Sequence, residues 1–247
     1  EVFDDLTTFA KNAEKDSTFR VAPAYRGDKI MNIEADSYLD YLKKLEELTH
    51  SVSTLSDLED ALEIRLKEFI KVGCTASDIA VEQVLPVYDK KDAEKVYKKR
   101  YSGKKITADD ADVFKGYLTY FLMKLYAKYD IRTELHVGAM RNNNTNMLNA
   151  LGLDTGFDSI SETNSIKNMS RLFDKLNCEN ALPAVAVFNL NPKMNTEIMT
   201  LIGSFQSSEI EGKMQYGPAW WFLDNKVGME NHLKDLTSTG HIAKFIG

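Results

Sequence analysis

Cysteine is scarce in this chain and no long apolar stretch occurs, so several classes of protein are not expected. The 247 residues include two cysteines, Cys74 and Cys178, which do not form a Cys-x-x-Cys pair. A disulfide framework is therefore not expected, and a reducing cytoplasm is the predicted location. No apolar run approaches the roughly 20 residues that a membrane-spanning helix needs. The sequence thus predicts neither a secreted disulfide scaffold nor a membrane protein.

Basic residues are fewer than acidic residues in this chain. Lysine and arginine number 31 against 37 aspartates and glutamates, which gives a net charge of -6 and a pI near 5.4. This balance argues against a nucleic-acid partner and offers no basic patch to a membrane surface. A chain of this length buries roughly 70–75% of its unfolded surface. That is enough for one α/β barrel-sized domain or for two smaller domains.

Apolar strand-like segments alternate with amphipathic helical segments along the whole chain. The segments predicted as strands are 19–25, 74–78, the run ending at His136, 183–190, 213–216 and 243–247. The segments predicted as helices are 38–48, 56–72 with a capping box at Ser56 to Glu59, a long helix capped by Thr107 to Asp110, 165–176, 196–204 and 228–238. Tandem strand–helix units predict a parallel sheet with helices outside it.

Two architectures satisfy this order, an open doubly wound sheet and a (β/α)8 barrel. No GxGxxG or P-loop spacing occurs, which lowers the nucleotide-binding version of the open sheet. The predicted fold class is α/β, with residues 1–247 as a single barrel region. The polar, lysine-rich stretch around 86–107 is predicted to be a helical excursion on the solvated outer face.

Polar and aromatic residues follow successive predicted strands, which is where parallel α/β folds place their sites. These residues are Arg26 and Asp28, Asp78, His136 with Arg141, Asn142, Asn143 and Asn144, Asn189 with Asn191, and Trp220 with Trp221. Guanidinium groups match carboxylates, amides pair with hydroxyls, and indole rings offer flat walls for the apolar face of a sugar. The pattern favours a site for a polyhydroxylated anion.

Each of these groups also has a structural explanation, and the residue pattern leaves both open. A histidine at a strand end is often a structural residue, and asparagines form turns because they tolerate the left-handed region. The tryptophans are also typical of packing at a barrel rim, and Arg26 with Asp28 is typical of a surface turn. His50, His232 and His241 have no supporting pattern and are expected at the surface.

Four motifs resemble those of uronate isomerase, a sugar-acid isomerase of the amidohydrolase superfamily. They are Arg20 to Lys29, His136 to Thr145 continued by Leu151 to Ile160, Leu201 to Gln206, and Gln215 to Asp224. The second and fourth are long enough to be specific, and the similarity runs through almost the whole chain in family order.

The resemblance implies a distorted (β/α)8 barrel that interconverts an aldose hexuronic acid and its ketose, such as glucuronate and fructuronate, through an enediol. A divalent metal, often zinc, would polarise the substrate oxygens. On this resemblance Arg26 and Arg141 hold the carboxylate or polarise oxygens, His136 is a candidate metal ligand, and Trp220 and Trp221 wall the sugar. The implied partner is the hexuronic acid, and association into a homo-oligomer stays open.

The chain departs from the family pattern at two positions and at both ends. Ile79 stands where the family has a histidine, and Leu223 stands where it has an asparagine. The family's His-x-His metal motif would precede Glu1, and its aspartate and arginine after the eighth strand would follow Gly247. The chain begins without methionine or a signal segment, so we expect strands three to seven and the beginning of eight. We expect this piece alone to be inactive.

Two other functions remain open from the sequence. One is a metal-dependent hydrolase of the amidohydrolase type on the same barrel, which would need an activated water and a general base. The other is a sugar-acid-binding module without catalysis, which the changes at Ile79 and Leu223 would favour.

Overall fold

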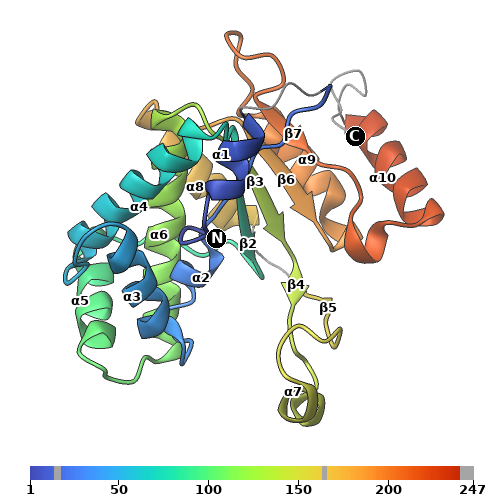
Figure 1. The fold of residues 1–247 in the computed structure, drawn as a ribbon. Coiled ribbons are helices and arrows are strands. Elements are labelled where there is room, and N and C mark those ends of the chain that lie inside the picture. Colours follow the sequence, from blue (N-terminus) through green and yellow to red (C-terminus); the bar gives the residue numbers. More distant parts are fainter. Residues whose placement is uncertain (14–17, 163–165, 240–247) are drawn as a thin grey trace. The chain divides into compact units, whose positions relative to one another are not determined.

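The structure is a computed structural model that describes residues 1–13, 18–162 and 166–239 (Figure 1). Its strands are β1 (Tyr25–Arg26), β2 (Ala76–Val81), β3 (Arg132–Val137), β4 (Ala139–Met140), β5 (Ser159–Ile160), β6 (Val185–Asn189) and β7 (Met214–Tyr216). Its α-helices are α1 (Thr7–Ala13), α2 (Asp28–Met31), α3 (Tyr38–Leu48), α4 (Leu55–Lys71), α5 (Lys90–Tyr101), α6 (Ala108–Lys128), α7 (Thr145–Leu151), α8 (Ile166–Cys178), α9 (Asn195–Gly203) and α10 (Lys226–Thr239). Short 3-10 helices are η1 (Pro192–Met194) and η2 (Trp221–Leu223).

Five strands form one sheet in the order β1-β2-β3-β6-β7, and β4 and β5 form a separate two-stranded ribbon. The pairs β1–β2 and β6–β7 are parallel, with Arg26 opposite Asp78 and Val187 opposite Tyr216. Helices connect successive strands of the sheet, as a parallel order requires. No helix among the described residues is both long enough and apolar enough to cross a membrane.

The described chain divides into two compact units. Unit 1 contains residues 1–79, 85–133 and 171–183, and unit 2 contains residues 80–84, 134–170 and 184–247. A single barrel region over residues 1–247 stays a prediction. The polar stretch around 86–107 belongs to unit 1 and contains helix α5.

An aromatic cluster forms the core of unit 1. The buried ring of Tyr25 meets Phe69 of α4 edge-on at 5.1 Å and Tyr126 of α6 at 6.0 Å. Its hydroxyl donates to the carbonyl of Leu62 at 2.9 Å, which satisfies the polar end of a side chain that is otherwise surrounded by apolar groups. This packing fixes β1, and with it the neighbouring Arg26.

Two capping boxes fix where the long helices of unit 1 begin. Thr107 accepts from the Asp110 amide at 3.1 Å and Asp110 accepts from the Thr107 amide at 2.9 Å, as predicted. The box predicted at Ser56 to Glu59 is wrong by two residues. Thr54 and Asp57 form it instead, because the Thr54 hydroxyl accepts from the Asp57 amide at 3.1 Å, and α4 therefore begins at Leu55.

The strand predictions hold best where the apolar run is continuous. The predicted strands at 183–190 and 213–216 are confirmed as β6 and β7. The first strand is shorter than predicted, because Pro23 lacks the amide hydrogen that a ladder needs, and only Tyr25 and Arg26 pair. The second begins at Ala76 and extends to Val81 instead of covering 74–78. The predicted strand at 243–247 lies outside the described residues.

Glu63 on α4 joins this helix to the end of α6 by an ion pair whose strength depends on pH. Its carboxylate accepts from Lys128 at 2.8 Å and from the Tyr129 hydroxyl, and Lys67 lies 3.0 Å away. These hydrogen bonds, that of Lys128 first, lower the pKa of Glu63 from an ordinary 4.5 to about 2.

We expect the free energy of unfolding to decrease as the pH falls from about 5 to 2. The folded-state pKa of Glu63 is depressed, so its contribution is complete above the unfolded-state pKa and is lost as the pH falls through the folded-state value. Urea unfolding at several pH values tests this with Glu63→Gln. Between pH 5 and pH 2 the variant should lose about 1 kcal/mol less unfolding free energy than the parent, a small difference because solvent screens the ion pair. An identical loss in the variant would contradict this assignment.

Candidate functional site

The first group of candidate site residues lies in unit 1, where β1 ends. Arg26 donates from Nε to Asp28 at 2.7 Å, and its Nη1 lies 3.3 Å from Asp78 Oδ2. The parallel register of β1 with β2 brings Asp78 beside the arginine. Burial alone would lower the pKa of the Arg26 guanidinium, but Asp28 and then Asp78 outweigh it and raise that pKa. Arg26 is thus a fixed cation, oriented by two carboxylates.

The second group lies in unit 2 and begins at the end of β3. Leu135 and Val137 are buried, and strand alternation turns His136 to the opposite face of the sheet. The His136 ring stacks on Phe188 of β6, with centroids 4.4 Å apart and planes 11° apart, and it meets the ring of Trp220 edge-on at 4.7 Å. Close packing at Phe188 needs glycine at position 217, because a Cβ there would lie 2.6 Å from the Phe188 ring.

Arg141 and Trp221 extend this second group. The Arg141 guanidinium lies over the Trp221 ring, with 5.1 Å between its carbon and the ring centroid. Its Nε is 3.1 Å from Asp158, and its Nη2 donates to Asp154. The rings of Trp220 and Trp221 are 5.7 Å apart. We call His136, Phe188, Trp220, Trp221 and Arg141 the aromatic–arginine cluster, because each member contacts at least one other member.

Asn142 and Asn143 build the loop that carries Arg141. Asn142 has a positive φ of 54°, its amide donates to Asp158 at 2.8 Å, and its side-chain oxygen accepts from the Asp154 amide at 3.1 Å. Asn143 donates to the carbonyl of Met140 at 2.9 Å. These contacts are those of turn-forming residues, the alternative left open by the sequence. They position the two carboxylates that hold Arg141, and direct contact of either asparagine with a substrate stays a prediction.

A buried polar network in unit 2 was missed at the level of sequence. Tyr216, at the end of β7, donates to Asn195 Oδ1 at 2.5 Å, and Asn195 donates to Asp235 of α10 at 2.9 Å. Asn189 of β6 donates to Tyr216 at 3.3 Å. The positions of Asn189 and Tyr216 at adjacent strand ends were a signal for this network, because parallel strands bring their carboxyl ends together.

His232 is buried, so its predicted place at the surface is wrong. Its ring stacks on Tyr216 with centroids 4.5 Å apart and is 2% exposed. Burial lowers the pKa of His232, and we infer a neutral imidazole near pH 7. Helix α10 packs this histidine inward, and an isolated helical segment gives no sign of which side will meet a strand. His50 is exposed as expected, and His241 lies outside the described residues.

The metal expected from the family resemblance does not fit the described residues. Within residues 1–13, 18–162 and 166–239, no group of three or more His, Cys, Asp or Glu side chains is placed to hold a metal ion. His136, the candidate ligand, has the aromatic rings of Phe188 and Trp220 as its ring neighbours. No chemical step is therefore assigned to a metal.

The fold and these two groups define an α/β protein with a five-stranded sheet and with polar residues that follow its strands. The family described as glucuronate isomerase matches residues 1–247. The uronate isomerase of Caldanaerobacter subterraneus is 45% identical over 236 residues, which are 95% of this chain and 51% of that protein. The uronate isomerase of Clostridium perfringens is 37% identical over 248 residues, which are 99% of this chain and 53% of that protein.

Solved structures agree with this assignment. The uronate isomerase of Thermotoga maritima superposes with a TM-score of 0.88 at 27% identity, over 97% of this chain and 52% of that one. A glucuronate isomerase from Caulobacter crescentus gives 0.88 at 23% identity, over 100% and 50%, and this likeness shows the fold alone. A partial (β/α)8 barrel is thereby confirmed.

The chain belongs to the glucuronate isomerase family. It spans about half the length of the curated relatives that it matches. The resemblance that the four motifs carried is confirmed, whereas the individual site residues remain predictions.

Proposed function

We propose that the protein interconverts a hexuronic acid and its ketose, glucuronate with fructuronate or galacturonate with tagaturonate. Membership of the glucuronate isomerase family supports this proposal. The observation that carries it is the Arg141 guanidinium held over Trp221 by Asp154 and Asp158. A fixed cation on an aromatic wall suits a ligand that joins a carboxylate to a sugar ring.

Different members of the aromatic–arginine cluster would bind different parts of the substrate. Asp158 and Asp154 engage Nε and Nη2 of Arg141, so we propose that the substrate carboxylate approaches through Nη1. The indole faces of Trp220 and Trp221 would cover the C–H face of the sugar. The side chain of Asp158 is only 4% exposed. This buried carboxylate therefore holds the Arg141 guanidinium in place.

His136 is the proposed proton carrier of the isomerisation. In the direction from aldose to ketose, the C2 proton leaves, an enediol forms, C1 takes up a proton, and the O2 hydroxyl proton moves to O1. The flat contact with Phe188 restricts how the His136 ring can turn. A role for Arg26, which Asp28 and Asp78 orient, stays a prediction from the family resemblance.

Zinc, a cytoplasmic location and a homo-oligomer stay predictions from the sequence and its resemblance. No described residue contact argues for the hydrolase or for the binding module over the isomerase. We therefore propose the isomerase alone.

A chimera tests the proposed function. In the Caldanaerobacter uronate isomerase, the matched 236 residues would be replaced by this chain, and turnover of glucuronate would be followed by the appearance of the ketose. We expect turnover, and we expect Arg141→Met to lower kcat/KM by about 100-fold, the usual consequence of removing one partner of a close charge pair.

The matched control is Arg132→Met, which removes an exposed arginine at the opposite end of β3. This variant should keep the parent kcat/KM. A chimera that is folded by circular dichroism but binds glucuronate without converting it would favour the binding module. A folded chimera that neither binds nor converts glucuronate would refute the proposed function.

A further inference from the structure

A pocket on the outer side of α6 lies within unit 1 and belongs to neither group of candidate site residues. Its volume is about 630 Å³, within the range of roughly 300–1,000 Å³ that is usual for small-molecule sites. Helix α6 turns Leu122 toward Gly27 and Tyr126 toward Tyr25 on its inner side. Its other side supplies the floor of the pocket. We call it the lysine–tyrosine pocket; its main residues are Tyr117, Tyr120, Phe121, Lys124, Lys128 and Lys175.

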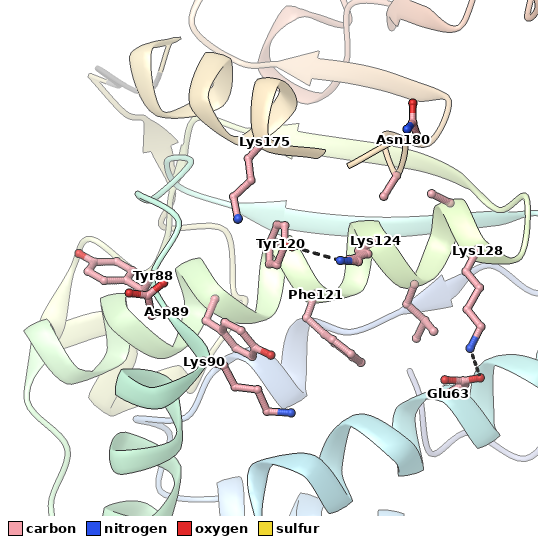
Figure 2. A pocket seen from close by; sticks show the side chains of 14 residues that line it. Glu63, Tyr88, Asp89, Lys90, Tyr120, Phe121, Lys124, Lys128, Lys175 and Asn180 are labelled. Carbon is pink, nitrogen blue, oxygen red and sulfur yellow. Dashed lines mark hydrogen bonds and ion pairs between the residues drawn. The ribbon is translucent and has the colours of Figure 1, made fainter. Parts of the chain in front are cut away.

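The floor of the lysine–tyrosine pocket is aromatic. Tyr117, Phe121 and Lys124 succeed one another at helical spacing along α6, and the rings of Tyr117 and Tyr120 are 6.5 Å apart. Figure 2 shows Tyr120 and Phe121 on α6, with Lys175 reaching from α8 toward Tyr120. Flat side chains that are spaced in this way can receive a ring by stacking or by edge contact.

One end of the pocket is already organised around a carboxylate. Glu179 accepts from Lys124 at 2.6 Å, from the Tyr120 hydroxyl at 2.6 Å and from Lys175 at 3.0 Å. Both lysines also lie over the Tyr120 ring, with their Nζ atoms 5.7 and 5.0 Å from its centroid. Two ammonium groups therefore share one carboxylate here, which leaves an excess of positive charge in a chain whose net charge is -6.

The other ends of the pocket differ in charge. Lys128 pairs with Glu63 at 2.8 Å, and Lys90 pairs with Glu59 at 2.5 Å. Asp89 lines the pocket on the side of Tyr88 (Figure 2), so an anionic group is disfavoured there. The charge pattern thus gives a ligand one orientation, with its anion toward Lys124 and Lys175.

We propose that the lysine–tyrosine pocket binds a small aromatic carboxylate. The ring lies on Phe121 beside the largely buried ring of Tyr117, and the carboxylate joins Glu179 between Lys124 and Lys175. Lysine ammonium groups carry three donors each, so each can serve a second carboxylate without leaving the first. All the contacts that support this site lie in unit 1, so the proposal does not depend on the isomerase activity.

Titration of the isotope-labelled chain with phenylacetate, followed by NMR, tests this site. We expect saturable shifts at the amides of Tyr117, Phe121 and Lys124. The uncharged probe phenylacetamide has nearly the same shape, and it should bind at least about tenfold more weakly because it loses a charge-assisted hydrogen bond.

Two variants distinguish the pocket from general attraction to lysines. Lys124→Gln should weaken phenylacetate binding by about tenfold, and Phe121→Ala should weaken both probes. The matched control is Lys43→Gln on α3, where an exposed lysine lies 3.6 Å from Asp40; it should bind phenylacetate as the parent does. Equal affinity for the two probes, shifts that never saturate, or unchanged binding in folded Lys124→Gln would each overturn the proposal.

Discussion

Replacing Gly116 with valine is expected to lower the free energy of unfolding by about 3 kcal/mol or more, as overpacking at rigid positions does. Gly116 lies within α6, where the chain of residues 86–88 crosses the helix. A Cβ at this position would overlap the carbonyl oxygen of Pro86 and would lie 2.8 Å from Cδ2 of Tyr88. The oxygen belongs to the backbone, so the helix or the crossing segment must shift.

Gly116→Ala decides between two opposing effects. Alanine in a helix interior is usually more stable than glycine by about 1 kcal/mol. At position 116 we expect the overlap with Pro86 to outweigh that gain, so this variant should also be less stable in urea unfolding followed by circular dichroism. Gly203→Ala in α9 is the control, because nothing lies within 4 Å of a Cβ built there. Equal stabilisation by both alanines would show that the segment does not cross α6 as described.

Replacing Asn195 with leucine is expected to cost about 2–4 kcal/mol, since buried polar groups lose their partners. Asn195 is 2% exposed. Its side-chain oxygen accepts from Tyr216 at 2.5 Å and from Asn189 at 3.4 Å, and its nitrogen donates to Asp235 at 2.9 Å. Leucine has the same branched arrangement of side-chain heavy atoms and is larger than asparagine, so no cavity forms and the lost hydrogen bonds contribute most of the cost.

A double-mutant cycle with Tyr216→Phe separates the parts of this cost. Tyr216→Phe removes the hydroxyl that needs an acceptor, so we expect it to cost only about 1 kcal/mol. In the double variant the hydroxyl is no longer stranded, and the combined loss should be smaller than the sum of the single losses. Additive losses measured in urea would mean that Tyr216 and Asn195 are not coupled as their distance indicates.

Local signals in the sequence predicted the regular elements well. The apolar spacing of 38–48 matches α3, and the Thr107 box begins α6 as expected. The box expected at Ser56 and Glu59 forms instead at Thr54 and Asp57, because backbone geometry, and not residue type alone, decides where a helix begins. The ribbon of β4 with β5 has two residues in each strand, too few for any periodicity to appear.

The sequence supplied candidate residues for a site, which remain predictions, and it did not supply their contacts. Arg26, His136 and Arg141 were candidates because they end or follow predicted strands, and parallel strands carry site residues at their carboxyl ends. The partners of Arg141 are Asp154 and Asp158, and only the folded loop brings them to the guanidinium. The burial of His232 against Tyr216 likewise depends on how α10 packs, which no local pattern specifies.

Calorimetric binding of glucuronate and of glucose to the chimera, with and without Arg141→Met, tests the central claim most directly. If Arg141 on the Trp221 ring recognises the acid group, the parent should prefer glucuronate, and the variant should lose about 100-fold in glucuronate affinity while its glucose affinity is unchanged. A folded variant that still prefers glucuronate by the parent's margin would contradict the claim.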